Sequence, residues 1–234
     1  MTEELSFEVY LGLSQKKFEI YLLDKKNLKN IYKEEVHLKN GSDLIEYNLL
    51  NSFLDKNIFK IEKLIGNFLR SINVILENDQ TLNCLIGIKK KNYGKKINKY
   101  YLESSLVELK NLFKENHQNK KMIHFIVNRC SIDGVNYTSF DEEIDGDYMC
   151  VEVNFISIPN FLIKEISNVL EKYQIKIDCF FEKHYIKSFF EGDSLDLSAS
   201  AFKIRSGYNQ NEIDLVPKSL KKKGFFEKFF QLFS

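Results

Sequence analysis

The first forty residues contain short runs in which apolar and polar positions alternate, as in strands with one buried face. The alternation predicts strands at about 7–11, 17–23 and 28–38. Gly12 and residues 24–27 supply the turns between these strands. The chain is therefore expected to open with a three-stranded meander.

A helical period follows the meander. Asn57 is expected to cap a long helix that continues to about Glu77, because apolar side chains recur on one face of this segment. That face consists of Ile58, Ile61, Ile65, Phe68, Leu69, Ile72 and Leu76. Two further helices are expected at about 101–115 and 161–173.

Later apolar runs predict strands at about 81–89, 122–128 and 147–158. With the helix at 101–115 they make a compact strand, helix, strand, strand unit. The next helix and a strand at 175–181 resemble the end of an α/β layer instead. The chain is therefore expected to leave one domain, form this unit and return.

The pattern weakens over residues 191–216. Leu195, Leu197, Ala199, Ala201 and Ile204 allow one more strand there. This region is therefore expected to be a linker or a residual strand.

The charge balance argues against a protein dedicated to nucleic acid. The 34 Lys and Arg residues nearly equal the 33 Asp and Glu residues, which gives a formal net charge of +1. Only Arg70, Arg129 and Arg205 are arginines, the residue type that recognises phosphates and bases in a bidentate manner. No nucleic-acid partner is expected.

The sequence has no apolar run of about 18 residues, so no membrane-spanning helix is expected. Met1-Thr2-Glu3-Glu4 is acidic and no apolar run follows it, so no signal peptide is expected either. The four cysteines lack the spacing of a metal site and are expected to be buried, reduced thiols. The protein is expected to stay in the cytoplasm.

The clearest chemical signal lies in residues 217–234. Placed on a helix, five phenylalanines form one apolar face, and three lysines precede them. About 11 helical residues at about 1.5 Å each cover roughly half of a bilayer core, so the segment can lie in the headgroup region but cannot span. The expected membrane-binding residues are Lys221, Lys222, Lys223, Phe225, Phe226, Lys228, Phe229, Phe230, Leu232 and Phe233.

Anionic lipid is the expected partner of this segment, because lysines beside inserted phenylalanines suit an anionic surface. A helix docked on the protein's own core and a helix that fills a partner's groove are the alternatives. One such segment binds weakly, so stable attachment requires several linked copies.

Four features follow one another along the chain. They are the meander around Leu11-Gly12-Leu13-Ser14, the helix at Phe59-Lys60-Ile61-Glu62-Lys63, the strands at Ile123-His124-Phe125, Ile132-Asp133-Gly134 and Cys150-Val151-Glu152-Val153, and the C-terminal amphipathic segment. Their order resembles the bacterial cell-division protein FtsA, the actin-like membrane tether of the division ring. The resemblance implies a mixed α/β (α+β) fold, namely a partial actin and ribonuclease H-like domain with an inserted SHS2-like subdomain, called 1C, and a C-terminal amphipathic helix.

The resemblance also implies a division of the chain into five parts. These are the first part of actin-like subdomain 1A at 1–80, the SHS2-like subdomain at 81–158, the return to 1A at 159–190, the linker or residual strand at 191–216, and the membrane-targeting helix at 217–234.

Two departures from the FtsA family reduce the expectation of nucleotide binding. The family's first phosphate loop carries an Asp-x-Gly type motif, whereas Gly12-Leu13-Ser14-Gln15 has no Asp. A second actin-like half is expected after Phe190, yet only residues 191–216 precede the tail. We therefore expect a truncated form with a degenerate phosphate loop at Gly12 and Ser14, no cofactor (ATP included) and no enzymatic activity.

Other candidate chemistry has simpler interpretations. The acidic run from Asp141 to Asp147 does not match a calcium loop, so no metal site is expected, and Asp145-Gly146 is expected to form a hairpin turn. His124 lies in an apolar strand without a nucleophilic partner and is expected to be structural. Glu8 and Glu19 are the only carboxylates expected in the first two strands, and no partner that would make a nuclease site is evident.

The sequence thus predicts a peripheral protein of the inner membrane, on its cytoplasmic face at the division site. The resemblance implies self-association and contacts with other division proteins. Binding of FtsZ is left open, because the family's FtsZ-binding region lies in the absent half. The alternatives are a soluble adaptor whose C-terminal helix binds a partner's groove, and a reduced actin-like ATPase that completes its cleft with another chain.

Overall fold

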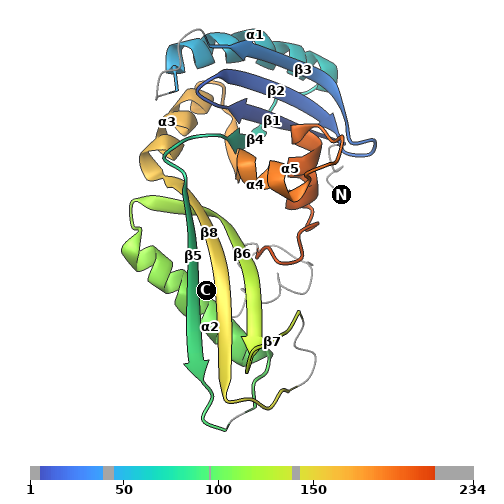
Figure 1. Cartoon of the computed structure of the whole chain (residues 1–234). Helices are drawn as coiled ribbons and strands as arrows, with labels where there is room; N and C mark the ends of the chain where they lie inside the picture. The colour runs from blue at the N-terminus through green and yellow to red at the C-terminus, as the bar shows by residue number, and fades with distance from the viewer. Residues whose placement is uncertain (1–5, 39–44, 95, 139–142, 214–234) are drawn as a thin grey trace. The chain divides into compact units, whose positions relative to one another are not determined.

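The computed structural model describes residues 6–38, 45–94, 96–138 and 143–213 (Figure 1). The membrane-binding residues expected between Lys221 and Phe233 lie outside these described residues. Within the described residues, no helix is long and apolar enough to cross a bilayer.

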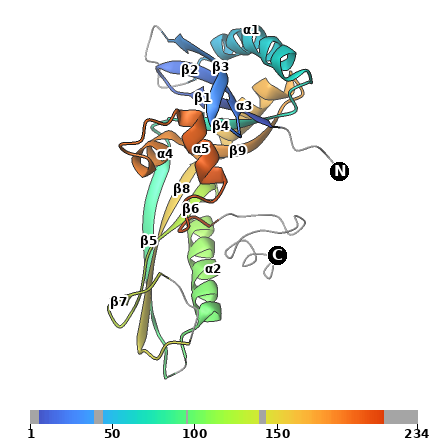
Figure 2. The ribbon, with the colours of Figure 1, turned by 90° about the vertical axis from the view of Figure 1, so that its right-hand side faces the viewer.

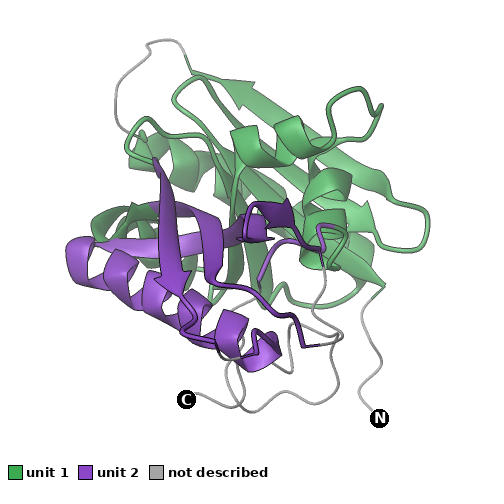
Figure 3. Ribbon diagram, turned by 60° about the horizontal axis from the view of Figure 1, so that its bottom comes forward, with its two compact units in different colours: residues 1–81, 158–208 green, residues 82–157, 209–234 purple. Residues whose placement is uncertain are grey.

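The chain forms two compact units (Figure 3). Unit 1 contains residues 1–81 and 158–208, and unit 2 contains residues 82–157 and 209–234. The chain therefore passes into unit 2 twice, the second time just before the tail.

Unit 1 is built on a five-stranded mixed sheet with the strand order β3-β2-β1-β4-β9. The strands are β1 (Phe7–Leu13), β2 (Lys17–Asp24), β3 (Lys29–His37), β4 (Ser71–Leu76) and β9 (Lys176–Glu182). β1, β2 and β3 pair in antiparallel fashion, whereas β4 runs parallel to β1 and β9 parallel to β4. The predicted meander is confirmed.

Helices cover both faces of this sheet. On one face lie α1 (Tyr47–Ile65) and α3 (Asn160–Glu171), and on the other lie α4 (Lys183–Phe189) and α5 (Leu197–Arg205). Alternation along the strands explains this layering, because Phe18 packs against Phe53 of α1 with ring centroids 6.3 Å apart, while Tyr21 faces the α4 and α5 side.

Unit 2 has a four-stranded sheet in the order β5-β8-β6-β7, with one helix on one face (Figure 2). Its elements are β5 (Leu82–Lys91), α2 (Lys99–Asn116), β6 (Lys120–Ile132), β7 (Val135–Asn136) and β8 (Tyr148–Pro159). Phe155 of β8 stacks on Phe113 of α2 and on Phe125 of β6, with centroids 4.7 and 4.9 Å apart. The mixed α and β composition of the predicted fold is confirmed, whereas the identity of unit 2 as an SHS2-like subdomain stays a prediction.

The long helix predicted from Asn57 to Glu77 is wrong. Helix α1 begins ten residues before Asn57 and ends at Gly66, which adopts φ 69°, and residues 71–76 form strand β4. Asn57 lies inside the helix, where its side chain accepts a hydrogen bond from Tyr32 and donates one to the Phe53 carbonyl. A central parallel strand is apolar on both faces, so the apolar residues of β4 also fit the spacing of a helix and cannot be distinguished from one by periodicity.

The linker or residual strand predicted for 191–216 is also wrong over its central part, because residues 197–205 form α5. The small residues Ala199 and Ala201 are fully buried, and Ile204 completes the apolar side of the helix. Alternation of small apolar residues over so short a stretch does not distinguish a strand from a helix.

The hairpin turn predicted at Asp145-Gly146 lies elsewhere. Asp133 and Gly134, with φ 48° and 87°, form the tight turn between β6 and β7. Gly146 instead packs tightly against this turn, since a Cβ atom built on it would lie 2.2 Å from Ile132 Cγ2.

Candidate functional site

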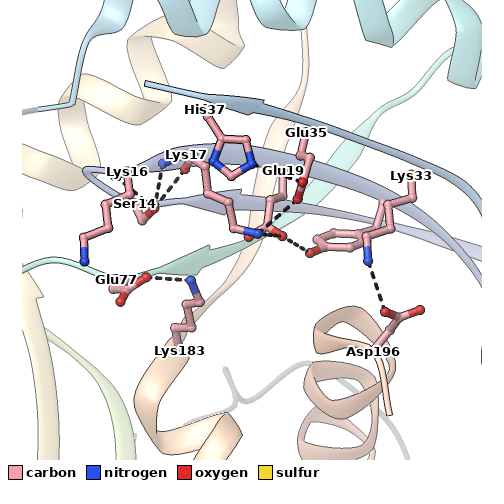
Figure 4. A network of polar contacts seen from close by, with 11 residues as sticks. Ser14, Lys16, Lys17, Glu19, Lys33, Glu35, His37, Glu77, Lys183 and Asp196 are labelled. Carbon is pink, nitrogen blue, oxygen red and sulfur yellow. Dashed lines mark hydrogen bonds and ion pairs between the residues drawn. The ribbon is translucent and has the colours of Figure 1, made fainter. Parts of the chain in front are cut away.

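The ends of the parallel strands of unit 1 bring a set of polar side chains together (Figure 4). β1 ends at Leu13, and its carbonyl accepts a hydrogen bond of 2.9 Å from the backbone N–H of Glu77, which follows β4. Lys183 follows β9 in the same way. In open α/β sheets this edge is where ligands bind, so it is the candidate site.

The turn between β1 and β2 satisfies its own hydrogen-bonding groups. Ser14 Oγ accepts hydrogen bonds from the backbone N–H groups of Lys16, at 3.3 Å, and Lys17, at 3.0 Å. Ser14 N–H donates to the Lys17 carbonyl at 3.1 Å. The amides that a phosphate loop would aim at its ligand are therefore used within the turn.

Glu19 lies opposite Gly12 in the strand pair, and it is 6% exposed. Lys17 Nζ lies 2.7 Å from Glu19 Oε1, and the Tyr21 hydroxyl donates to the same oxygen at 2.6 Å. Burial and this hydrogen bond raise the pKa of Tyr21 well above its ordinary value. Gly12 is the residue that permits the arrangement, because a Cβ atom there would lie 3.2 Å from Glu19 Cβ.

Glu77 and Lys183 form a second ion pair, with the Lys183 ammonium 2.5 Å from Glu77 Oε2. Partial burial works to raise the pKa of Glu77, but the hydrogen bond and charge of Lys183 outweigh it and hold that pKa below its ordinary value. Glu182, just before Lys183, accepts hydrogen bonds from the N–H groups of His184 and Tyr185 and so caps α4.

A third cluster lies on the same face of the sheet, around Glu8 of β1. The Tyr10 hydroxyl donates to Glu8 Oε2 at 2.7 Å, and Arg205 of α5 lies 3.3 Å from the same oxygen. Arg205 also donates to Asn73 Oδ1 at 3.2 Å. Glu8 and Glu19 thus each have a cationic partner, which neutralises the negative charge that a catalytic metal would require.

Within the described ranges, no group of three His, Cys, Asp or Glu side chains is placed to hold a metal ion. Asp145, in the acidic segment before β8, forms an ion pair instead, because its Oδ2 lies 2.7 Å from Lys96 Nζ.

The root of the tail is the second candidate site, and it belongs to unit 2. Asn211 accepts a hydrogen bond from Val127 N–H, and Ile213 N–H donates to the Phe125 carbonyl, both at 2.8 Å. Ile213 is 3% exposed and belongs to the core of unit 2. Residues 211–213 therefore extend the edge of β6, and three residues separate them from the tail in the sequence.

The sequence predicted that Gly12 supplies the first turn, but Gly12 lies within β1 and pairs with Glu19, and the turn begins at Ser14. The side chains that surround these two residues were not predicted. Lys183, Glu77 and Arg205 come from segments far apart along the chain, and no local motif marks them. Glu8 and Glu19 stand alone among apolar residues in their strands, and a buried carboxylate requires a partner. This pattern predicts that cations lie nearby, but not which ones.

The structure is similar to the solved PilM-PilN type IV pilus biogenesis complex, with a TM-score of 0.50 and 10% identity over 78% of this chain and 49% of that chain. The chain thus spans about half the length of that protein. No family model matches the sequence, and no curated protein matches it.

Two other solved structures have lower scores. The cytoplasmic domain of EpsL, an inner membrane component of the Vibrio cholerae type II secretion system, has a TM-score of 0.38 and 12% identity, over 77% of this chain and 59% of that chain. A Bacteroides thetaiotaomicron protein with an actin-like ATPase fold has a TM-score of 0.31 and 15% identity, over 80% and 57% of the respective chains. These two scores do not establish a shared fold.

The strand order of unit 1, with helices on both faces, is that of one actin and ribonuclease H-like domain. The similarity at a TM-score of 0.50 agrees with this topology. The chain therefore contains a partial actin-like domain, as the sequence predicts.

Proposed function

We propose that this chain is a membrane-associated assembly module of a bacterial cell-envelope machine, similar to FtsA in the division ring, and that it does not hydrolyse nucleotide. One observation carries the proposal. Residues 211–213 are hydrogen-bonded into unit 2, and the Lys- and Phe-rich residues 218–234 begin after four intervening residues. A membrane-binding segment that starts from a folded unit transmits its attachment to the body.

The polar end of the unit 1 sheet supports a role without hydrolysis. The amides of Lys16 and Lys17 donate to Ser14 Oγ, and Glu19 and Glu77 are neutralised by Lys17 and Lys183. A nucleotide would have to break these interactions before it gained its own.

Avidity makes such a tether effective. Each lysine near an anionic surface contributes about 1 kcal/mol, so one tail holds the protein weakly and several linked tails hold it firmly. In the described residues β3 and β5 are edge strands of their sheets, and their backbone groups offer contacts to further copies or to other division proteins. FtsZ binding is left open.

Co-sedimentation with vesicles tests the tether. The full chain is expected to pellet with phosphatidylglycerol vesicles, less so at high salt, and not with phosphatidylcholine vesicles. The variant Phe226→Glu with Phe229→Glu is expected to stay in solution. The matched control, Gln231→Glu with Ser234→Glu, adds the same charge to the polar face and is expected to retain most binding.

Two results would contradict the tether. If the Phe226 and Phe229 variant still pellets, the phenylalanine face is not the binding element. If the wild-type chain ignores both lipid type and salt, the soluble adaptor with a groove-binding helix is the better explanation.

Localisation in cells tests the division role separately. A fluorescent fusion of the full chain is expected to gather at the division site and to lose this position with the tail variant. The similarity to a pilus biogenesis complex suggests a second candidate machine. A membrane-bound pattern away from the division site would favour that class and remove the division role.

A further inference from the structure

Three large apolar side chains are exposed at the end of α1 and in the turn that follows it. Phe59 is 71% exposed, Leu64 is 53% exposed and Phe68 is 83% exposed. We use the name α1 tip for the exposed side chains of this segment, namely Phe59, Leu64 and Phe68 together with Lys56, Lys63 and Arg70. No other large apolar side chain in the described part of the chain is as exposed as Phe68.

The turn holds Phe68 outward. Gly66 ends α1 in the left-handed conformation, with its N–H donating to the Glu62 carbonyl at 2.9 Å. The side chain of Glu62 also accepts a hydrogen bond of 2.9 Å from Leu69 N–H, and Leu69 is buried. Both ends of the turn are thus tied to one residue, and the exposed position of Phe68 is built into the fold.

Cations flank these apolar side chains. Lys56, Phe59 and Lys63 lie on the face of α1 opposite its buried residues, because they are three and four positions apart. Arg70 follows the turn. None of the ion pairs among the described residues includes Lys56, Lys63 or Arg70.

The nearby carboxylates are already engaged. Asp55 accepts a hydrogen bond from the Tyr173 hydroxyl at 2.7 Å, and Glu62 closes the turn as described. These neutral donors leave both carboxylates charged, so Lys56, Lys63 and Arg70 outnumber them by one positive charge. The α1 tip is therefore apolar at its most projecting point, with a small excess of positive charge around it.

Charge complementarity indicates which kind of partner binds the α1 tip. A partner must accept projecting phenylalanines and also present negative charge around them, which is the chemistry of an anionic bilayer surface. The chain's own tail is also rich in lysine, so like charges disfavour it as the occupant, and a symmetric contact with a second copy would bring Lys63 against like charges.

We propose that the α1 tip is a second membrane-binding site, in which Phe59 and Phe68 enter an anionic lipid surface while Lys56, Lys63 and Arg70 contact its phosphates. The inference rests on the proposed function, because it adds a second attachment point to the tail. Two weak sites on one chain raise the overall affinity beyond that of either alone.

Fluorescence tests each site separately, because the natural sequence has no tryptophan. We expect the emission of Phe68→Trp in the full chain to shift to shorter wavelength on phosphatidylglycerol vesicles, with reduced quenching by acrylamide. The emission of Phe226→Trp on the same vesicles measures insertion of the tail. Phe161→Trp is the matched control, because Phe161 is 52% exposed on α3 beside Lys164 and Glu165, whose charges balance.

Partitioning into the same vesicles gives the size of the effect. Phe59→Ser with Phe68→Ser is expected to lower the partition coefficient about tenfold, because two exposed aromatic side chains no longer become buried in lipid. Thermal unfolding should stay unchanged, since both side chains are exposed in the native state. Lys56→Glu with Lys63→Glu should weaken binding, whereas the same positions changed to Arg should not.

The outcomes separate the two proposals. A shift of Phe226→Trp without a shift of Phe68→Trp overturns the α1 tip and leaves the tail tether. A shift in the emission of Phe68→Trp without a shift of Phe226→Trp overturns the tail tether and leaves the α1 tip. An equal shift on phosphatidylcholine, or a shift of Phe161→Trp as large as that of Phe68→Trp, overturns the assignment of the α1 tip as an anionic-lipid site.

Discussion

His124 Nδ1 lies 2.5 Å from Glu212 Oε1, although the two residues are 88 positions apart in the sequence. Both side chains are largely buried, and the pair joins β6 to the segment that precedes the tail. The histidine that the sequence suggested to be structural thus helps to hold the root of the tail.

Glu212→Ala is expected to loosen residues 209–213 at a cost of about 1–3 kcal/mol, because the buried His124 side chain loses its hydrogen bond to Glu212. Hydrogen exchange provides the measurement. The amides of Val127 and Ile213, which bond across this pairing, should exchange faster, while those of unit 1 stay protected. Glu171→Ala, an exposed change on α3, should have no such effect, and unchanged protection in Glu212→Ala would refute this role.

ATP is expected not to stabilise the chain, because the turn between β1 and β2 uses its amides internally. A ligand present at about a hundred times its Kd adds about 2.7 kcal/mol, which thermal unfolding detects readily. Ser14→Ala is expected to lose about 1 kcal/mol of stability without gaining a response to ATP. A rise in Tm that depends on ATP concentration would restore the reduced ATPase as the better hypothesis.

The burial of Glu103 predicts that the stability of the chain depends on pH. Its side chain is almost fully buried in α2, Oε2 has no hydrogen-bond partner, and burial raises its pKa despite Lys99 at 4.0 Å. The folded state therefore binds the carboxyl proton of Glu103 more tightly than the unfolded state does. Stability from this residue is lost as the pH rises from the ordinary glutamate range through the raised pKa.

Glu103→Gln removes this loss, so it should stabilise the chain at neutral pH and have little effect in acid. Each unit of raised pKa corresponds to about 1.4 kcal/mol. Urea unfolding of wild type and variant at several pH values measures the difference. Glu115→Gln, on the exposed side of the same helix, should show no pH-dependent gain, and a constant difference for Glu103→Gln would contradict the interpretation.

Gly146→Ala is expected to destabilise the chain by about 1–3 kcal/mol, because its Cβ atom would lie 2.2 Å from Ile132 Cγ2. Gly87 offers a matched control in strand β5, where the closest atom to a Cβ would be Glu152 Cγ at 3.3 Å, a contact that a small side-chain adjustment relieves. Gly87→Ala should be close to neutral. Equal urea midpoints for the two variants would show that residue 146 tolerates a side chain.

The sequence alone determined the strands of the meander, α2 and α3, and it is the source of the predicted amphipathic pattern of the tail. Each of these depends on a period of two or 3.6 residues, or on composition, within a short segment. The same local rule placed the end of α1 wrongly, because an apolar stripe continues from helix into β4 without a change that periodicity can detect.

Tertiary structure decided the rest. Glu8 pairs with Arg205, which is 197 positions away in the sequence, and Glu77 pairs with Lys183, which is 106 positions away. No local pattern therefore predicts that these carboxylates are neutralised. Ile213 became a core residue of unit 2 only because β6 offered an open edge for pairing. Amphipathic periods are properties of a segment, whereas ion pairs and edge pairing depend on which segments the fold brings together.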